Sequence, residues 1–526
     1  MESFKKKYDI KTIYNLSIAL ISVVFSFCLI FAHEIWRDEG QAWIIARDTP
    51  LTQLISVLKH EGHPVLWYLV LMPFAKSGLP CIWLNYISWG LTAFTILFIA
   101  IKAPWHPVFK TVVFFSPMFV YWIPVVSRSY ALLNFLIVLT AYIYQKRKEH
   151  PIIYGGLLFL MINTHVIIAG LVGAALLEML YDIRLEWRDT KRISRSVGTG
   201  FMIGVIGCLF MVAQLVGSPG TGDWNVSLIP DLSFILNSLQ QVTIIMFSTT
   251  KAWQVNGLSM LLVFFNVALV VSLVVRKEWR LLLYYVLSIG FIWYILIFVL
   301  YSGNKMYIIY SICLFVLWNL KEIKTRAVME GIIGVVMTLS MLTGYPNAIL
   351  FDIQNLYSSG RITADYLNQI VTDEDVVIFY DNTYEGAITP YLNRNIRVWD
   401  ITEGDYYYYT VWSPERTHNN EFLGVLYESG LSEEQDGEST GYSGHSMTDF
   451  FQAYIDQVFE KETTVYMVLD SVNASYFDME STDVRRMEVG SFYGDCRYTG
   501  ENYKVYRMVS MTDFEHTDPS AEDSID

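Results

Sequence analysis

Long apolar runs fill the first two thirds of the chain, and their length predicts membrane-spanning helices. The hydrocarbon core of a bilayer needs about 20 apolar residues per helix. The runs that reach or approach this length are 14–33, 82–101, 108–126, 130–144, 151–164, 166–181, 198–217, 257–275, 281–300, 306–320 and 327–343. A further run, 64–79, is shorter and contains Pro73 and Lys76, so we interpret it as an interfacial or partly inserted helix. The pattern therefore predicts a polytopic α-helical membrane protein with about eleven crossings.

The pattern changes near residue 343, where short runs of strand and helix character replace the long apolar ones. We expect helices near 361–370, 385–392 and 449–460, and strands near 376–380, 396–401, 464–470 and 503–509. Alternating strands and helices predict a small α/β domain. The chain then divides into a membrane domain over 1–343 and a soluble domain over 344–526. The tyrosine run 406–409 can stack on sugar rings or form one face of a strand.

Composition and charge agree with this division. The 526 residues are 53% hydrophobic and 17% charged, with a net charge of −14. Nucleic-acid binding needs a basic face, so this balance argues against a nucleic-acid partner. The average hides a contrast, because residues 344–526 carry a net charge of −24 and residues 1–343 a net charge of +10.

The distribution of lysine and arginine predicts the orientation in the membrane. With Lys5, Lys6, Lys7 and Lys11 in the cytoplasm, eleven crossings place 20 Lys and Arg residues in cytoplasmic segments and seven on the other side. Cytoplasmic loops of membrane proteins are enriched in these residues. We therefore expect a multi-pass protein of the cell membrane with a cytoplasmic N-terminus and an extracytoplasmic C-terminal domain.

The first outer loop, 34–63, contains two segments, 40–47 and 52–59, that fit short amphipathic helices lying flat on the bilayer. The apolar residues that can rest on the membrane surface in this arrangement are Trp36, Trp43, Ile44 and Ile45. The loop would then bring its charged residues to the boundary between membrane and water.

Two adjacent carboxylates, Asp38 and Glu39, stand at the start of this loop. At the boundary, a carboxylate can take a proton from a polar acceptor while a lipid-bound donor approaches from the bilayer. The alternative is that both are solvated and pair with Arg37. The residues alone leave both interpretations open.

Three further polar side chains reach the same outer surface, namely Arg128, His165 and Lys305. An anionic lipid phosphate needs fixed positive charge, and arginine can bind it with two parallel hydrogen bonds. These three are therefore candidate phosphate-binding residues. The alternatives are that Arg128 and Lys305 are boundary residues and that His165 satisfies a helix end. On its residues alone, His63 fits a turn before Pro64.

The loop resembles that of the GT-C glycosyltransferases, and more narrowly the group of protein O-mannosyltransferases and the lipid A aminoarabinose transferase. The matching stretches are 36–43 (WRDEGQAW) and 62–68 (GHPVLWY). The order of helices to about residue 215 and the C-terminal extracytoplasmic domain also match in layout. The motifs themselves cover only about thirty residues.

This resemblance implies a GT-C fold and transfer of a sugar from a polyprenyl-phosphate donor to an extracytoplasmic acceptor, which is an envelope glycan, a lipid or a protein. It makes Asp38 the general base, with Glu39 supporting it or holding a cation, and puts His63 beside the donor. Members of the group often carry a carboxylate where this chain has Arg128, which puts a metal site in doubt. The sequence requires no cofactor and leaves a divalent metal open.

A competing interpretation is a lipid or solute transporter, or a flippase, with an accessory outer domain. Transporters usually show repeated halves and ionisable residues in the middle of the membrane. In this chain the two halves do not match, and the charged residues gather at the outer boundary. The pattern therefore favours the enzyme.

Overall fold

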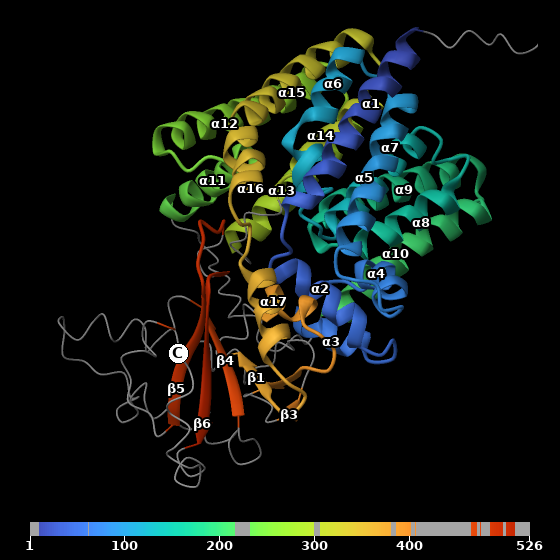
Figure 1. Cartoon of the computed structure of the whole chain (residues 1–526). Coiled ribbons are helices and arrows are strands. Elements are labelled where there is room, and N and C mark those ends of the chain that lie inside the picture. The colour runs from blue at the N-terminus through green and yellow to red at the C-terminus, as the bar shows by residue number, and fades with distance from the viewer. Residues whose placement is uncertain are drawn as a thin grey trace, which may run out of the picture.

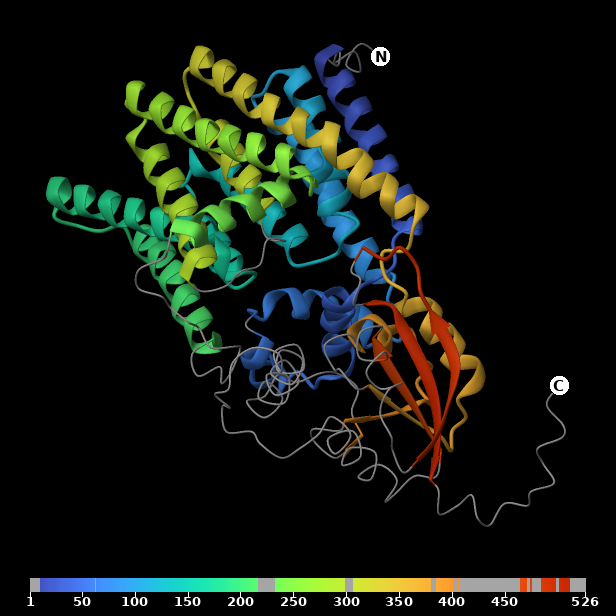
Figure 2. The same cartoon turned by 90° about the vertical axis from the view of Figure 1, so that its left-hand side faces the viewer.

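A computed structural model describes the fold of this chain. The residues that it describes are 10–61, 63–215, 232–298, 306–379, 385–400, 405–406, 464–470, 474, 484–497 and 501–510. The helices form one body and the strands form a sheet beside it, with α2 and α3 between the two (Figures 1 and 2).

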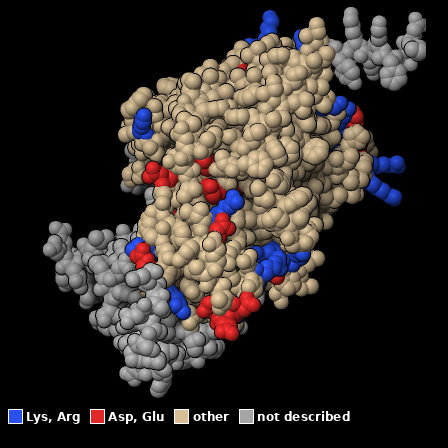
Figure 3. Space-filling model, viewed as in Figure 1, with Lys and Arg blue, Asp and Glu red and all other residues tan. Residues whose placement is uncertain are grey.

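Seven helical segments in the described ranges are long and apolar enough to cross a membrane. They are α1 (Ile10–Leu29) with the 3-10 turn η1 (Ile30–Ala32), α5 (Trp83–Lys102), α9 (Ala169–Thr190) after η3 (Val166–Ile168), α10 (Arg195–Leu215), α12 (Ala252–Val275), α13 (Trp279–Phe298), and α15 (Ile323–Gly344) continued by η5 (Tyr345–Ile349) and α16 (Leu350–Gln354). Large apolar side chains such as Phe94, Leu209 and Phe264 are exposed on these helices, and the face in Figure 3 shows few charges over the helical part. The chain is therefore a polytopic α-helical membrane protein.

The remaining apolar helices are shorter. They are α4 (Leu66–Ala75), α6 (Pro107–Phe115) with the π-helical turn η2 (Met118–Trp122), α7 (Tyr130–Tyr144), α8 (Pro151–Ile162), α11 (Leu232–Phe247) and α14 (Ile308–Asn319). Every residue of α14 is buried, so this helix runs inside the bundle. In the described residues each predicted apolar run contains a helix, α4 is short as expected, and α11 was not predicted. The number of crossings, eleven, stays a prediction.

The first loop folds into two helices, α2 (Arg37–Asp48) and α3 (Leu54–Glu61), close to the predicted segments. The prediction that their apolar side chains rest on the bilayer surface is wrong for α2. Trp43 is 1% exposed, and Ile44 and Ile45 are fully buried, because α2 packs against α4 on one side and against the sheet domain on the other. Trp36 is buried as well.

The sheet has six strands in the order β3-β2-β1-β4-β6-β5. They are β1 (Val376–Phe379), β2 (Arg397–Asp400), β3 (Asp405–Tyr406), β4 (Thr464–Asp470), β5 (Val484–Phe492) and β6 (Tyr503–Ser510). β1 lies parallel to β2 and β4, and the other pairs are antiparallel. Helix α17 (Gly360–Ile370) packs through Ala364 and Leu367 on the sheet. The expected α/β character and four expected strands are confirmed.

Other expectations for this domain are met only in part. The segment 385–392 forms two 3-10 turns, η6 (Glu385–Ala387) and η7 (Thr389–Tyr391), because it contains Gly386 and Pro390. Strands β3 and β5 were not predicted. The expected helix 449–460 and residues 407–409 of the tyrosine run lie outside the described residues. The boundary drawn at residue 344 falls inside the helical segment that runs on to Gln354.

Candidate functional site

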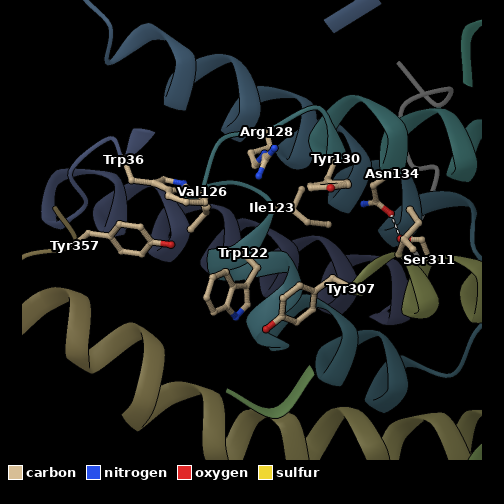
Figure 4. A pocket seen from close by; sticks show the side chains of 11 residues that line it. Trp36, Trp122, Ile123, Val126, Arg128, Tyr130, Asn134, Tyr307, Ser311 and Tyr357 are labelled. Carbon is tan, nitrogen blue, oxygen red and sulfur yellow. Dashed lines mark hydrogen bonds between the residues drawn. The ribbon is translucent and has the colours of Figure 1, made fainter. Parts of the chain in front are cut away.

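A pocket opens between the helical part and the segment that follows α16. The side chains that line it come from the residue before α2, from η2 and the segment after it, from α7, from the start of α14 and the residue before it, and from the segment after α16. They are Trp36, Trp122, Ile123, Val126, Arg128, Tyr130, Asn134, Tyr307, Ile308, Ser311 and Tyr357 (Figure 4). Because five of them are aromatic, we call it the aromatic pocket. Arg128 is the one cation among these eleven residues.

Arg128 connects the pocket to the predicted base. Its guanidinium Nη1 donates a short hydrogen bond to Oδ2 of Asp38, forming an ion pair. The side chain of Asp38 is 32% exposed and also lies 3.6 Å from Arg37 Nε, whereas that of Arg128 is 14% exposed. The structure thus brings together two predicted site residues that are 90 positions apart in the chain. Neither side chain is therefore an isolated charge at the membrane boundary.

Glu39 is not among the residues that line the pocket, and it is fully buried. Its carboxylate accepts hydrogen bonds from His33 Nε2 at 2.9 Å, from the backbone N–H of Trp36 at 3.3 Å and from the backbone N–H of Ser127. The last of these bonds fixes the residue next to Arg128. Glu39 therefore orients the turn that carries Arg128.

A histidine that the sequence reasoning missed, His33, lies between two buried carboxylates. Its Nδ1 is 3.1 Å from Asp352 Oδ2, and Asp352 also accepts a hydrogen bond from Tyr121 at 2.9 Å. Burial alone would lower the pKa of His33, but Glu39 and Asp352 outweigh it and raise the pKa to about 10. His33 is therefore a charged group that ties the end of α1 to α2 and α16.

The two other candidate residues in the described part of the chain, His165 and His63, lie next to each other, and His165 lies next to Tyr130. His165 stacks on Tyr130 with ring centroids 5.3 Å apart, and its Nε2 is 3.3 Å from the tyrosine hydroxyl. His63 lies next to His165, also at 5.3 Å between ring centroids. His165 Nδ1 accepts the backbone N–H of Ile167, so it does satisfy a helix end. Lys305 lies outside the described residues.

Several pocket residues do not belong to any motif that marks a functional site in the sequence. Trp122 ends the π-helical turn η2 and stacks on Tyr307 with centroids 5.4 Å apart. The prolines at 117 and 124 that flank this turn are the one sequence feature that marks a break in the helix. Trp122 also contacts the sheet domain, because the Arg497 guanidinium lies 5.1 Å from its ring centroid.

The described residues contain no group of three or more His, Cys, Asp or Glu side chains positioned to hold a metal ion. Asp38 faces a guanidinium, and Glu39 faces His33 and backbone N–H groups. The electrostatics of the site in the described ranges therefore come from arginine, carboxylate and imidazole side chains.

The sheet domain is docked directly on the helix that carries Asp38. The backbones of Gly40 and Gly386 touch, and a β-carbon on Gly40 would overlap the carbonyl oxygen of Gly386. The hydroxyl of Tyr391 accepts the Ile35 N–H at 3.0 Å, and Glu501 accepts the Arg37 N–H at 3.2 Å. A free backbone N–H in the first turn of a helix is a natural partner for a carboxylate. The sheet domain thus helps to fix the first turn of α2.

Glu501 makes this docking sensitive to pH. Burial raises the pKa of Glu501 to about 7, although hydrogen bonds from Ser358 and from the Arg37 N–H oppose the shift. The folded chain therefore binds more protons than the unfolded chain between pH 4.5 and 7, and the free energy of unfolding falls as the pH rises through this range. Glu501→Gln removes the group that titrates. Over this pH range we expect the free energy of unfolding of the variant to fall by roughly 3 kcal/mol less than that of wild type, so that the variant is more stable than wild type above pH 7.

Thermal unfolding of the full chain in detergent, followed from pH 5 to 8, measures this effect as the difference between variant and wild type. The matched control is Glu488→Gln, because Glu488 is a half-exposed glutamate of the same sheet, paired with Lys504 at 3.0 Å. If Glu501→Gln and wild type keep a constant difference across the range, Glu501 does not titrate at the interface.

No protein-family model matches this chain, and a search of curated proteins finds no match either. What is established is therefore the class defined by the fold: a polytopic helical membrane protein with a docked sheet domain and an aromatic pocket.

Proposed function

We propose that the protein is a membrane glycosyltransferase of the GT-C type. It moves a sugar from a polyprenyl-phosphate donor to an acceptor outside the cytoplasm, and it crosses the membrane eleven times with its sheet domain outside. The observation that carries the proposal is the Asp38–Arg128 pair at the edge of the aromatic pocket. An anion site, a carboxylate and an apolar cleft are the groups that this reaction needs, in one place.

In this reaction Asp38 and Arg128 each have one role. The acceptor hydroxyl oxygen forms a bond to the anomeric carbon of the sugar, and its proton passes to the carboxylate of Asp38. The bond between that carbon and the phosphate oxygen breaks, and its electron pair stays on the released polyprenyl phosphate. Arg128 stabilises the negative charge that grows on this oxygen.

The ion pair also couples donor binding to the base. The Arg128 guanidinium donates to Asp38. A phosphate that binds Arg128 competes for the same N–H groups and releases the carboxylate toward the acceptor. Asp38 is then free to accept a proton when a donor occupies the pocket.

The aromatic walls account for the rest of the donor. Trp36, Trp122 and Tyr307 offer apolar faces at the boundary of the membrane, where aromatic rings are favoured. His165 and His63 extend the polar edge beyond Tyr130 and are candidates for contact with the phosphate or the acceptor. Lys305 precedes Tyr307 by two residues in the sequence and stays a candidate for the same role.

The test is donor turnover by the full chain in lipid nanodiscs. A panel of polyprenyl-phosphate sugars is supplied with a crude envelope extract as acceptor, and release of free polyprenyl phosphate is measured. Release that depends on the acceptor supports the transferase and identifies the sugar. Absence of release from every donor, together with movement of a fluorescent polyprenyl phosphate between the leaflets of proteoliposomes that contain the same protein, would overturn it in favour of the flippase alternative.

A further inference from the structure

The inner end of the aromatic pocket carries a polar pair that the proposed reaction has not used. Asn134 of α7 and Ser311 of α14 each are 1% exposed, and the serine hydroxyl donates to Asn134 Oδ1 at 2.8 Å. The amide nitrogen of Asn134 has no hydrogen-bond partner in the described part of the chain. Figure 4 shows this pair at one end of the pocket, with Trp36 and Tyr357 at the other and Arg128 between.

A buried N–H group without a partner costs free energy, and protein interiors almost always satisfy such groups. Asn134 is one of the residues that line the pocket, and Figure 4 shows its amide nitrogen on the side of the other lining residues, so a hydrogen-bond acceptor that enters the pocket can satisfy it. The serine holds the other end of the amide and fixes its direction. The pair is therefore a donor directed at a ligand.

The surroundings indicate which part of a ligand reaches this donor. Tyr130 lies one helical turn before Asn134, and Tyr307 lies one turn before Ser311, so aromatic rings flank the polar pair. An aromatic face with a single placed amide suits a ring that has both C–H and hydroxyl surfaces. A prenyl chain has no acceptor to offer, and the phosphate has Arg128.

We propose that Asn134 and Ser311 form a subsite that binds a hydroxyl group of the donor sugar. The sugar lies at the inner end of the pocket with its phosphate toward Arg128. This subsite rests on the proposed function, because it presumes a sugar on a lipid phosphate. It makes Asn134 a residue that selects the sugar, whereas Arg128 binds every donor.

The test separates the sugar from the phosphate with two kinds of soluble probe, a lipid phosphate and its sugar esters. Calorimetry with the full chain in nanodiscs compares citronellyl phosphate with citronellyl-phosphate esters of glucose, galactose, mannose and arabinose. Asn134→Leu should weaken the best-bound ester about tenfold, as expected for loss of one buried hydrogen bond, and leave citronellyl phosphate unchanged. Ser311→Ala should weaken the ester about threefold, because the amide is no longer held.

The control is Asn319→Leu. Asn319 is as buried as Asn134 and lies at the other end of α14, where its amide donates to the Phe315 carbonyl at 3.0 Å. This change should affect neither probe. If Asn134→Leu binds citronellyl phosphate and the sugar ester as tightly as wild type does, or binds both more weakly by the same factor, the subsite is overturned while the donor assignment stands. Wild type that binds neither probe overturns the donor assignment and the subsite together.

Discussion

Replacement of Asp38 by asparagine is expected to lower turnover of the polyprenyl-phosphate donor by roughly 10²- to 10⁴-fold, the usual contribution of a general base. Asparagine has nearly the same shape but does not accept a proton from the acceptor hydroxyl. Binding of the donor should not fall with it. Because the ion pair that engages Arg128 is lost, the donor phosphate should bind as tightly as in wild type or more tightly.

Turnover and donor affinity are therefore measured on the same nanodisc preparation. Asp48→Asn is the matched control, since Asp48 ends the same helix and pairs with Arg47 at 2.7 Å, away from the residues that line the pocket. The control should keep its turnover. Unchanged turnover in Asp38→Asn would refute the assigned base, and a loss of turnover that is matched by loss of donor binding would make Asp38 a structural residue.

Hydropathy predicted most of the helical part because a helix in a bilayer must be apolar over its whole length. Each of the eleven predicted runs contains a helix in the described part of the chain. Helix α11 was missed because its middle is polar, with Asn237, Ser238, Gln240 and Gln241 in one stretch. The strands predicted from apolar runs lie at the centre of the sheet, whereas β3 and β5 lie at its edges, where the apolar signal is weaker.

The site was predictable only in part. The predicted topology puts Asp38 and Arg128 on the same side of the membrane, but no motif indicates that their side chains form a pair. Asn134 and Trp122 belong to the apolar runs, where a single polar or aromatic residue looks like ordinary packing. Their place in a pocket depends on which helices meet, and that is set by tertiary contacts.

The burial of α2 shows why the surface prediction was wrong. The amphipathic pattern of the loop correctly predicted an apolar face, but a bilayer and a protein domain are equally good partners for such a face. The sheet domain covers α2 through the close contact of Gly40 with Gly386, which leaves no room for a side chain at either position. Glycine at 40, directly after the two carboxylates, was the signal in the sequence.

The buried ion pairs of His33 with Glu39 and Asp352 should contribute strongly to the free energy of unfolding. His33→Gln keeps a hydrogen-bonding side chain but removes the charge between Glu39 and Asp352, so the two buried carboxylates lose the counter-charge that they share. Removing one partner of a buried ion pair typically costs about 3–5 kcal/mol. We expect a loss of this size in the free energy of unfolding, measured by thermal or denaturant unfolding of the full chain at pH 6.

The pH dependence distinguishes this effect from a simple packing defect. The pKa of His33 is raised from 6.5 to about 10, so its contribution to stability is fully present below pH 6.5 and is lost as the pH rises through 10. The difference between wild type and His33→Gln should therefore shrink from pH 6.5 to 10. His106→Gln, at an exposed helix start, is the control and should show no such trend. A difference that stays constant over this range would mean that His33 is neutral in the fold, and that Glu39 holds the Ser127–Arg128 turn without a charged partner.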